Sequence, residues 1–561
     1  MVINDFQFPG VELTQEFVET PVTGVSQLGV VVIGQQYKVS DVPAVTVTAG
    51  AATVITLPES EGVIDNTSDI SQIIVRDGLY PTFTATSAST GLRLSSGTIA
   101  TDRKTAELTF NARISDGTVS TTAFGECQPT VGGTVDVITS GNTNGVPSII
   151  ESISGVKMTV SPSDGRYTEG DTITGVKFYA TFDAKYTPTA QTSNTMTLAA
   201  DPTTKIPGTN TNATLVAGDY VMALKYSNLD EELQPTRKLG IVGSKAEIEK
   251  IFGTPCVENP VALALLFALY AGQTNRVYYM LTAADTGDDY VDALDILAKN
   301  NAVYSIVPVT DNYEAISDLI GAVERLANNP ESKTRNTVWY GVDTNATNVA
   351  EGVIGVVDTV GHSYRAQAVW ADDVLFNGQI VPNYIVAAAP AGMRSYEPTY
   401  RPISNLGYNF FTVKDTHELT KTALLSMGEK GVWLIDNNYD GTPINLRQIT
   451  TAVSNNINKD EESIVANADS IALTLCRVGE DLVGCSNISP DLLVALHDTL
   501  TGIMDRYLLN LTGNVYIGPQ LLSYSIDRLE QDPVQLDHIY ATITCEPPKP
   551  FNRFVMTLRI V

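Results

Sequence analysis

Between residues 237 and 342 the sequence alternates between short apolar runs and amphipathic segments. Three strand-like runs enclose two helical patterns, in the order 277–281, 289–299, 302–309, 315–328 and 337–342. Parallel strands need a crossover of this kind, because a tight turn can only join antiparallel neighbours. The segment therefore predicts a mostly parallel sheet with helices on both faces.

Local signals support this α/β pattern. Ser244 and Glu247 have the spacing of a capping box, and Gly253 marks the end of the same helix. Asn259 followed by Pro260 predicts the start of the next helix. Its apolar run, 261–271, is too short to cross a bilayer and indicates a buried helix.

The residues before this segment have a different pattern. Residues 29–34 form a β-branched run bounded by glycines, which is typical of a strand buried on both faces. Short β-like runs then recur between clusters of Gly, Ser, Thr, Asn and Asp, which predicts one or two β-sandwich or barrel domains within 37–226. The runs are 52–57, 72–76, 106–113, 155–161, 176–182 and 219–226.

The C-terminal part begins with helical patterns at 461–478 and 490–510. Two strand-like runs follow at 521–529 and 535–545, and a proline-rich stretch then precedes the apolar run 551–561. An apolar terminus usually frays unless it docks, so we expect this one to dock on something.

Composition excludes several functional classes. The 561 residues carry a net charge of −28, so phosphate backbones would repel the chain and we expect no nucleic-acid binding. The five cysteines lack CxxC spacing, which favours buried free thiols. The start lacks the features of a signal peptide, so we expect a soluble product made in a cytoplasm, with no direct membrane insertion.

The sequence also lacks catalytic and cofactor motifs. It has neither GxSxG nor GxxxxGK[ST]. The stretch 436–441 begins like a calcium loop, but Arg447 stands where the closing acid should be, so a tight turn is the better interpretation. Asp285 and His362 follow the Asp-then-His order of subtilisin, without a suitable serine downstream. We expect no enzyme activity, cofactor or metal.

Several segments, in order, resemble the contractile bacteriophage (myovirus) tail sheath proteins. They include Pro9-Gly-Val, Gly24-Val, the run 29–34 and Ile251-Phe-Gly. Further along they are 272–279, 381–392, 400–407 and the closing run 551–560. The resemblance covers about 1–36 and 237–561. Glu12 departs from it, because the family usually has an aromatic residue after Pro-Gly-Val.

The resemblance implies a fold and a set of domains. The fold is a subtilisin-like, non-catalytic α/β core with inserted all-β domains, an α+β C-terminal domain and extended arms at both termini. The loss of catalysis would explain the order of Asp285 and His362 without a serine. The implied domains are an N-terminal arm (1–27), the first core strand (28–36), β-rich outer domains (37–226), the rest of the core (227–440), an inner domain facing a tube (441–545) and a C-terminal arm (546–561).

The resemblance further implies that the arms add strands to sheets of neighbouring subunits. Residues 1–37 carry four acidic and no basic residues, whereas residues 546–561 carry one acidic residue, Glu546, and three basic residues. Opposite net charges suit strands paired in one sheet. The candidate arm residues are Val11, Glu12, Leu13, Thr14, Glu16, Phe554, Val555, Met556, Leu558, Arg559 and Ile560. The candidate strand-accepting hairpin residues are Tyr524, Ile526, Ile539, Ala541 and Ile543. Arms that fold back on their own domain are the alternative.

The implied function is that of a structural subunit of a contractile tail sheath. It would form a helical homo-oligomer of stacked rings, six-fold by the resemblance, around a tail tube and between baseplate and tail terminator proteins. It would lie in the virion tail after assembly in the bacterial cytoplasm. Another viral or surface-layer structural protein, or a carbohydrate-binding adhesin, remains the alternative.

Overall fold

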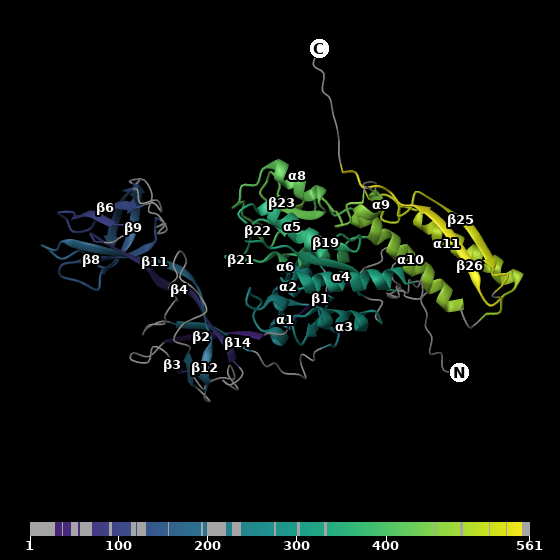
Figure 1. Ribbon diagram of the computed structural model, residues 1–561, viewed down its shortest axis with the longest axis horizontal. Coiled ribbons are helices and arrows are strands. Elements are labelled where there is room, and N and C mark those ends of the chain that lie inside the picture. Colours follow the sequence, from purple (N-terminus) through teal and green to yellow (C-terminus); the bar gives the residue numbers. More distant parts are fainter. Residues whose placement is uncertain are drawn as a thin grey trace, which may run out of the picture. The chain divides into compact units, whose positions relative to one another are not determined.

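The chain divides into two compact units, one of Met1–Tyr37 with Leu229–Val561 and one of Lys38–Asn228. Each is described here by itself, from a computed structural model (Figure 1). The structure describes residues 29–35, 38–46, 54–56, 70–88, 93–113, 119–120, 131–154, 156–191, 195–198, 220–226, 237–273, 276–299, 303–329, 334–454, 456–482, 486–514, 517–534 and 536–552.

The first unit is built on an eight-stranded sheet whose six central strands are parallel and whose two edge strands are antiparallel. In spatial order the strands are β15 (Gly240–Val242), β16 (Val277–Thr282), β1 (Gly29–Gln35), β17 (Val303–Pro308), β18 (Thr337–Gly341), β19 (Ala366–Ala371), β23 (Val432–Asn437) and β24 (Pro443–Asn445). This arrangement confirms the predicted mostly parallel sheet.

Strand β1 lies inside the sheet although both of its neighbours, β16 and β17, come much later in the sequence, after the inserted second unit. Val32 pairs with Tyr279 of β16, and Val31 pairs with Ile306 of β17. The side chains of 30–33 are fully buried, because helices cover both faces of the sheet. The prediction of a strand buried on both faces is confirmed.

Two helical layers enclose the sheet, with a separate apolar core under each. One layer contains α1 (Lys245–Phe252), α2 (Pro260–Gly272), α6 (Asn383–Val386) and α7 (Ala388–Tyr396). The other contains α3 (Gly287–Leu297), α4 (Tyr313–Asn328), α5 (Val349–Val360) and α8 (Lys421–Glu429). The helices on both faces are confirmed as well.

The first two helices of the core begin at the residues that local sequence signals predict. Ser244 accepts a hydrogen bond from the Glu247 amide at 3.2 Å, and Gly253 ends α1 with a φ of 77°. Asn259 does precede α2, but its side chain does not cap the helix. It donates instead to the carbonyl oxygens of Phe252 at 2.7 Å and Thr254 at 3.2 Å. The predicted start of α2 at Asn259 and Pro260 is confirmed, although the Asn259 side chain bonds to these buried carbonyls and not to the helix.

The second unit contains only strands among its described residues. A ten-stranded antiparallel sheet has Phe110 and Phe178 in its core, with ring centroids 5.7 Å apart. Its strands are β2 (Lys38–Thr46), β4 (Ile70–Thr86), β5 (Arg93–Ile99), β6 (Ala106–Arg113), β7 (Val119–Ser120), β8 (Thr134–Thr139), β9 (Val146–Ser154), β10 (Lys157–Pro162), β11 (Ile173–Tyr186) and β14 (Tyr220–Tyr226). A second sheet contains β3 (Val54–Thr56), β12 (Pro188–Gln191) and β13 (Thr195–Leu198).

The C-terminal elements of the first unit continue from the end of the large sheet. They are α9 (Ile457–Asp460), α10 (Glu462–Leu482), α11 (Pro490–Tyr507), β25 (Ser523–Gln531) and β26 (Ile539–Glu546). A small sheet of β20 (Val374–Phe376), β21 (Gln379–Val381) and β22 (Thr412–Val413) lies earlier in the chain. None of the helices in the described ranges has the length and apolarity that a membrane span requires.

Candidate functional site

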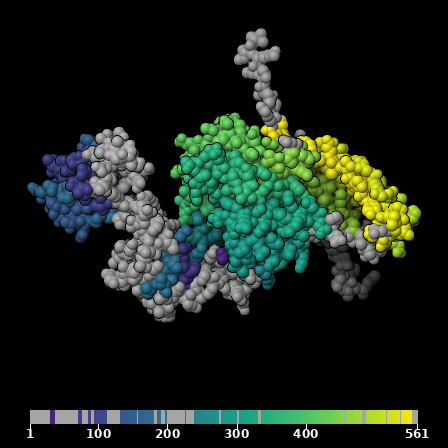
Figure 2. Space-filling model, viewed as in Figure 1, coloured from purple at the N-terminus to yellow at the C-terminus, as the bar shows by residue number. Residues whose placement is uncertain are grey.

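The C-terminal hairpin is a two-stranded antiparallel sheet. Tyr524 pairs with Cys545, Ile526 with Ile543, and Leu529 with Ala541. The register shifts between Ile526 and Arg528, so one strand carries a bulge at that point. Figure 2 shows the two strands, in yellow, at the surface of the molecule.

Two helices support one face of this hairpin. Met504 and Tyr507 of α11, with Ile471 of α10, form a small buried core, and Tyr524 and Ile543 pack against it. The Tyr524 hydroxyl also donates to the Asp505 carboxylate at 2.6 Å. A two-stranded hairpin is marginally stable alone, so these helices are what hold it in place.

The outer edges of the hairpin are the part of it that could pair with further strands. Within the described part of the chain, β25 pairs only with β26, so each strand presents one edge of unpaired backbone donors and acceptors. Such an edge is a template for another strand. Arg528 and Glu530, with Nη2 and Oε1 2.6 Å apart, place a charged pair on β25.

The five predicted hairpin residues occupy different environments. Tyr524 and Ile543 face the supporting helices, Ile526 and Ile539 are half-buried, and Ala541 is exposed. The sequence did not single out Cys545, which also packs against the core under the hairpin. The predicted arm residues in 11–16 and 554–560 lie outside the described residues.

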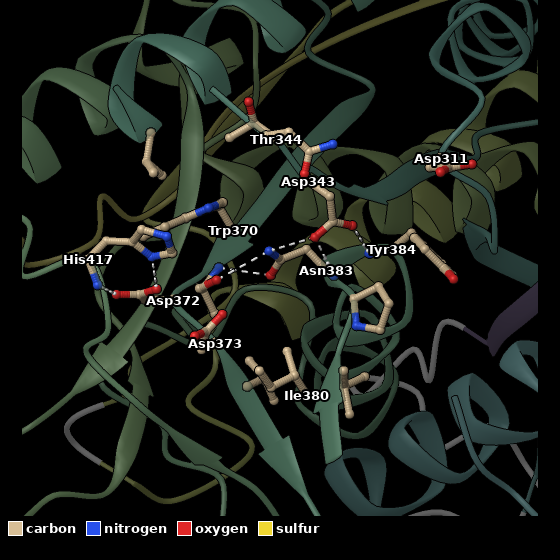
Figure 3. Close-up of a pocket in the computed structure, with 16 residues that line it drawn as sticks. Asp311, Asp343, Thr344, Trp370, Asp372, Asp373, Ile380, Asn383, Tyr384 and His417 are labelled. Atoms are coloured by element: carbon tan, nitrogen blue, oxygen red, sulfur yellow. Dashed lines mark hydrogen bonds and ion pairs between the residues drawn. The ribbon is translucent and has the colours of Figure 1, made fainter. Parts of the chain in front are cut away.

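A second feature lies at the carboxyl edge of the large sheet. An aspartate lies one to three residues after the end of each of several parallel strands: Asp285 after β16, Asp311 after β17, Asp343 after β18 and Asp372 after β19. The last three line a cavity of about 450 Å³ together with Asp373 and His417 (Figure 3). Ligands commonly bind at this edge in α/β folds. The sequence pattern that could have predicted this cavity is an aspartate shortly after each apolar run, and the sequence analysis did not use it.

Two of the carboxylates that line this cavity, those of Asp343 and Asp372, accept hydrogen bonds from neighbouring segments of the chain. Asp343 accepts hydrogen bonds from the amides of Asn383 at 2.9 Å and Tyr384 at 3.4 Å, which tie the start of α6 to β18. Burial raises the pKa of Asp343 above its ordinary value, although these bonds oppose the rise. Asp372 accepts from the backbone N–H of His417 at 2.8 Å, and its Oδ1 lies 2.5 Å from the His417 Nδ1. The lining residues include no serine or cysteine.

The Asp285 and His362 pair does not form. Asp285 follows β16 and therefore lies at the carboxyl edge of the parallel strands, whereas His362 precedes β19 and lies at the opposite edge. Asp285 accepts from the Thr310 hydroxyl at 2.8 Å, and His362 Nε2 lies 2.9 Å from Asp358. The interpretation of this pair as a remnant of a catalytic site is wrong, because the two residues lie at opposite ends of the parallel strands.

Two other predictions are settled. The stretch 436–441 ends β23 and enters a tight turn toward β24, in which the Asn438 amide donates to the Thr442 carbonyl at 2.9 Å, and Gly441 has a φ of 76°. Cys256 is a buried free thiol as expected, but Cys476 is exposed, because it lies on the solvent side of α10. Among the residues that the structure describes, no group of three or more acidic, histidine or cysteine side chains is placed to hold a metal ion.

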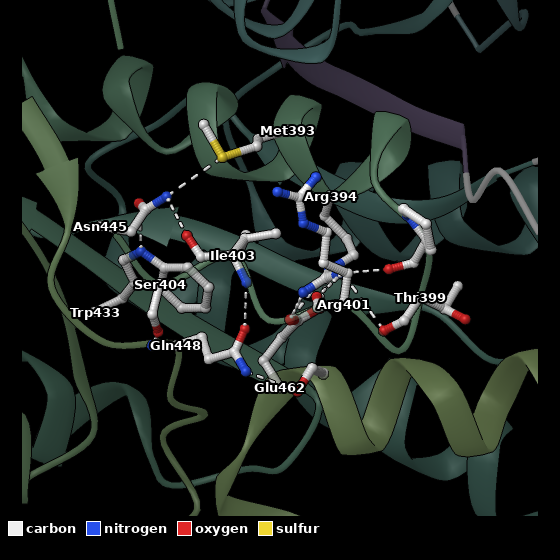
Figure 4. A network of polar contacts seen from close by, with 12 residues as sticks. Met393, Arg394, Thr399, Arg401, Ile403, Ser404, Trp433, Asn445, Gln448 and Glu462 are labelled. Atoms are coloured by element: carbon white, nitrogen blue, oxygen red, sulfur yellow. Dashed lines mark hydrogen bonds and ion pairs between the residues drawn. The ribbon is translucent and has the colours of Figure 1, made fainter. Parts of the chain in front are cut away.

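Buried charges join the hairpin's supporting helix to the α/β core. Glu462, at the start of α10, pairs with Arg394 of α7, with Oε2 and Nη2 2.5 Å apart and both side chains essentially inaccessible (Figure 4). One face of α10 thus also carries Asp469, seven residues later, which pairs with Arg365 and accepts from the Tyr304 hydroxyl at 2.8 Å. The first half of α10 is fixed to the core, and Ile471, just beyond it, contributes to the core under the hairpin.

The sequence matches no protein-family model and no curated protein. The fold is similar to the contracted helical sheath of the anti-feeding prophage, with a TM-score of 0.44 and 14% identity over 59% of this chain and 90% of that one. It is also similar to the contracted PVC sheath of an extracellular contractile injection system, with a TM-score of 0.45 and 11% identity over 59% and 88%.

A third solved structure extends over more of the chain. The sheath tail protein of Desulfitobacterium hafniense matches 93% of this chain and 97% of its own length, with a TM-score of 0.37 and 10% identity. The proteins to which this chain is similar in these comparisons are thus sheath proteins of contractile injection systems and sheath tail proteins.

Proposed function

We propose that this chain is a structural subunit of a contractile tail sheath. Copies would stack as rings, six to a ring, around a tail tube, and would contract to drive that tube through the host envelope. The observation that carries the proposal is the C-terminal hairpin, whose two outer edges pair with no other described strand while α10 and α11 pack against one of its faces. The ordered sequence resemblance supplies the strands that would fill those edges.

In this proposal the two arms of each copy add to hairpins of neighbouring copies. The acidic N-terminal arm and the basic C-terminal arm would lie in one four-stranded sheet around β25 and β26. Screened charge pairs contribute at most about 1 kcal/mol each, so they would set the register, while backbone hydrogen bonds join the subunits. The mesh would stay connected as the subunits shift as rigid bodies during contraction.

The α/β unit would be the non-catalytic core of the subunit, and the inserted β unit would face outward. A subtilisin-like origin of this core rests on the sequence resemblance, since Asp285 and His362 lie at opposite edges of the sheet. The tail tube, the baseplate and the tail terminator are the proposed partners, in a virion tail or a tail-like particle assembled in the bacterial cytoplasm.

Deletion of residues 1–20 tests the proposal. We expect the truncated chain to keep its circular dichroism and tryptophan fluorescence but to form no tubes in negative-stain electron microscopy. The substitution Val555→Pro should act similarly, because proline removes a backbone donor from the C-terminal arm. Val131→Ser, which changes a 63% exposed apolar residue of the inserted unit, is the matched control and should assemble normally. Normal tubes from the truncated chain, or shells and flat sheets from the intact one, would refute the proposal.

A further inference from the structure

The segment that follows the hairpin leaves its own sheet. Strand β26 ends at Glu546, whose carbonyl accepts from the Leu522 amide at 2.8 Å. Prolines occupy positions 547, 548 and 550. They have no backbone N–H and a fixed φ, so this stretch cannot continue the ladder and instead forms a stiff, extended connection.

The far end of this connection is held on another part of the unit. Lys549 Nζ donates to Asn458 of α9 at 2.6 Å. Asn552 Nδ2 donates to the Glu461 carboxylate at 2.7 Å. Neither α9 nor Glu461 belongs to the hairpin or to its two supporting helices beneath it.

The receiving site is built into the α/β core. The Glu461 side chain is completely buried, and the same oxygen that receives Asn552 also accepts from Arg447 Nη2 at 2.9 Å. Thr450 bonds to the carbonyl oxygens of Asp460 at 2.9 Å and Lys459 at 2.6 Å. The neighbouring Thr451 amide donates to Ala366, at the start of β19, at 2.9 Å. The contact point is therefore rigid.

We propose that residues 547–552 form a clamp that carries the chain from the hairpin to the core at Glu461. The clamp fixes the chain at Glu461 immediately before residue 553, and among the described residues the outer edges of β25 and β26 carry no strand, so that strands of a second copy of this chain can fill them. This inference rests on the proposed sheath function and adds to it the device that favours pairing between copies over pairing within one.

The clamp is tested on the unassembled full-length chain by limited proteolysis. Chymotrypsin cleaves after aromatic residues, and Phe551 lies within the clamp with 81% exposure. Residues around Phe551 must detach from the core before they can enter the active site of the protease, so the cleavage rate measures local opening of the clamp. We expect the double variant Lys549→Ala/Asn552→Ala to release the fragment 552–561 about tenfold faster than the intact chain, as measured by mass spectrometry.

Two control variants accompany this measurement. Lys104→Ala, at an exposed lysine of the inserted unit, should leave the rate unchanged. Glu461→Gln keeps an oxygen that can accept from Asn552, so its rate should stay within about threefold of the intact chain. An unchanged cleavage rate in the double variant would overturn the clamp while leaving the sheath proposal intact.

Assembly provides the second measurement. The double variant should form fewer tubes than the intact chain, and a C-terminal arm released by the substitutions should block its own hairpin. If the double variant opens faster yet assembles as fully as the intact chain, the clamp has no role in choosing the partner and this part of the inference fails. If the intact chain forms no tubes, the sheath function fails, and the proteolysis still decides whether the clamp exists.

Discussion

The buried pair of Arg394 and Glu462 provides the sharpest test of how the hairpin is held to the core. The Arg394 Nε donates to the Glu462 Oε1 at 2.8 Å, and Nη2 to Oε2 at 2.5 Å. The remaining nitrogen, Nη1, donates to the carbonyl oxygens of Pro398 at 3.1 Å and Arg401 at 3.0 Å. The Arg394 guanidinium is thus fully buried and donates hydrogen bonds only to protein oxygen atoms in the described part of the chain. We predict that Arg394→Met strongly destabilises this unit.

The magnitude follows from what the substitution leaves behind. Removing one partner of a buried ion pair costs about 3–5 kcal/mol, because the other charge stays buried without compensation. Glu462→Met should therefore cost a similar amount. In the double variant Arg394→Met/Glu462→Met neither charge remains, and only the carbonyl oxygens lose donors, at about 1 kcal/mol each. We expect a total cost of about 2–3 kcal/mol, against roughly 8 kcal/mol for the sum of the single variants.

Urea unfolding followed by tryptophan fluorescence measures these free energies. All three tryptophans, Trp339, Trp370 and Trp433, lie in the large sheet, so the signal reports the unit that contains the pair. The control is Lys245→Met, which breaks a half-exposed pair with Glu249 and should cost less than about 1 kcal/mol. A cost below 1 kcal/mol for Arg394→Met, or a double variant that costs the full sum, would refute this reasoning.

Two further predictions concern the core of the same unit. Burial raises the pKa of Asp343, so the folded state favours the protonated carboxyl group over the ionised one. The contribution of this group to the unfolding free energy is therefore fully present below the unfolded pKa of about 3.9, and it is lost as the pH rises through the folded pKa. The unfolding free energy of the intact chain relative to Asp343→Asn should therefore increase as pH falls through that window, and urea titrations that show no change or a decrease would contradict this. Gly392 of α7 lies against α2, where an added Cβ would be 2.7 Å from the Cα of Ala268. Gly392→Ala should cost about 1–3 kcal/mol in the same unfolding assay, because the helices must separate, and Gly355→Ala, at an open position of α5, should cost nothing.

Much of the α/β unit could be predicted because its signals are local. The apolar run at 29–34 predicts a strand buried on both faces, and the alternation after 237 predicts parallel strands with helical crossovers. Ser244 and Gly253 mark the ends of α1 through contacts within a few residues. The hairpin was also visible as two strand-like runs joined by a short connection. Its supporting core, which includes Ile471 of α10, was not visible, since that contact depends on how distant segments pack.

The candidate site shows the same division. The sequence by itself determined where many of the strands lie, that prolines end β26, and that an apolar run follows those prolines, because composition and periodicity act over neighbouring residues. Only the tertiary structure decided that Asp285 and His362 lie at opposite edges of the sheet, that Arg394 pairs with Glu462, and that Asn552 meets Glu461. The separation of Asp285 from His362 depends on strand direction and order, whereas the other two contacts depend on how distant segments pack and join residues 68 and 91 positions apart.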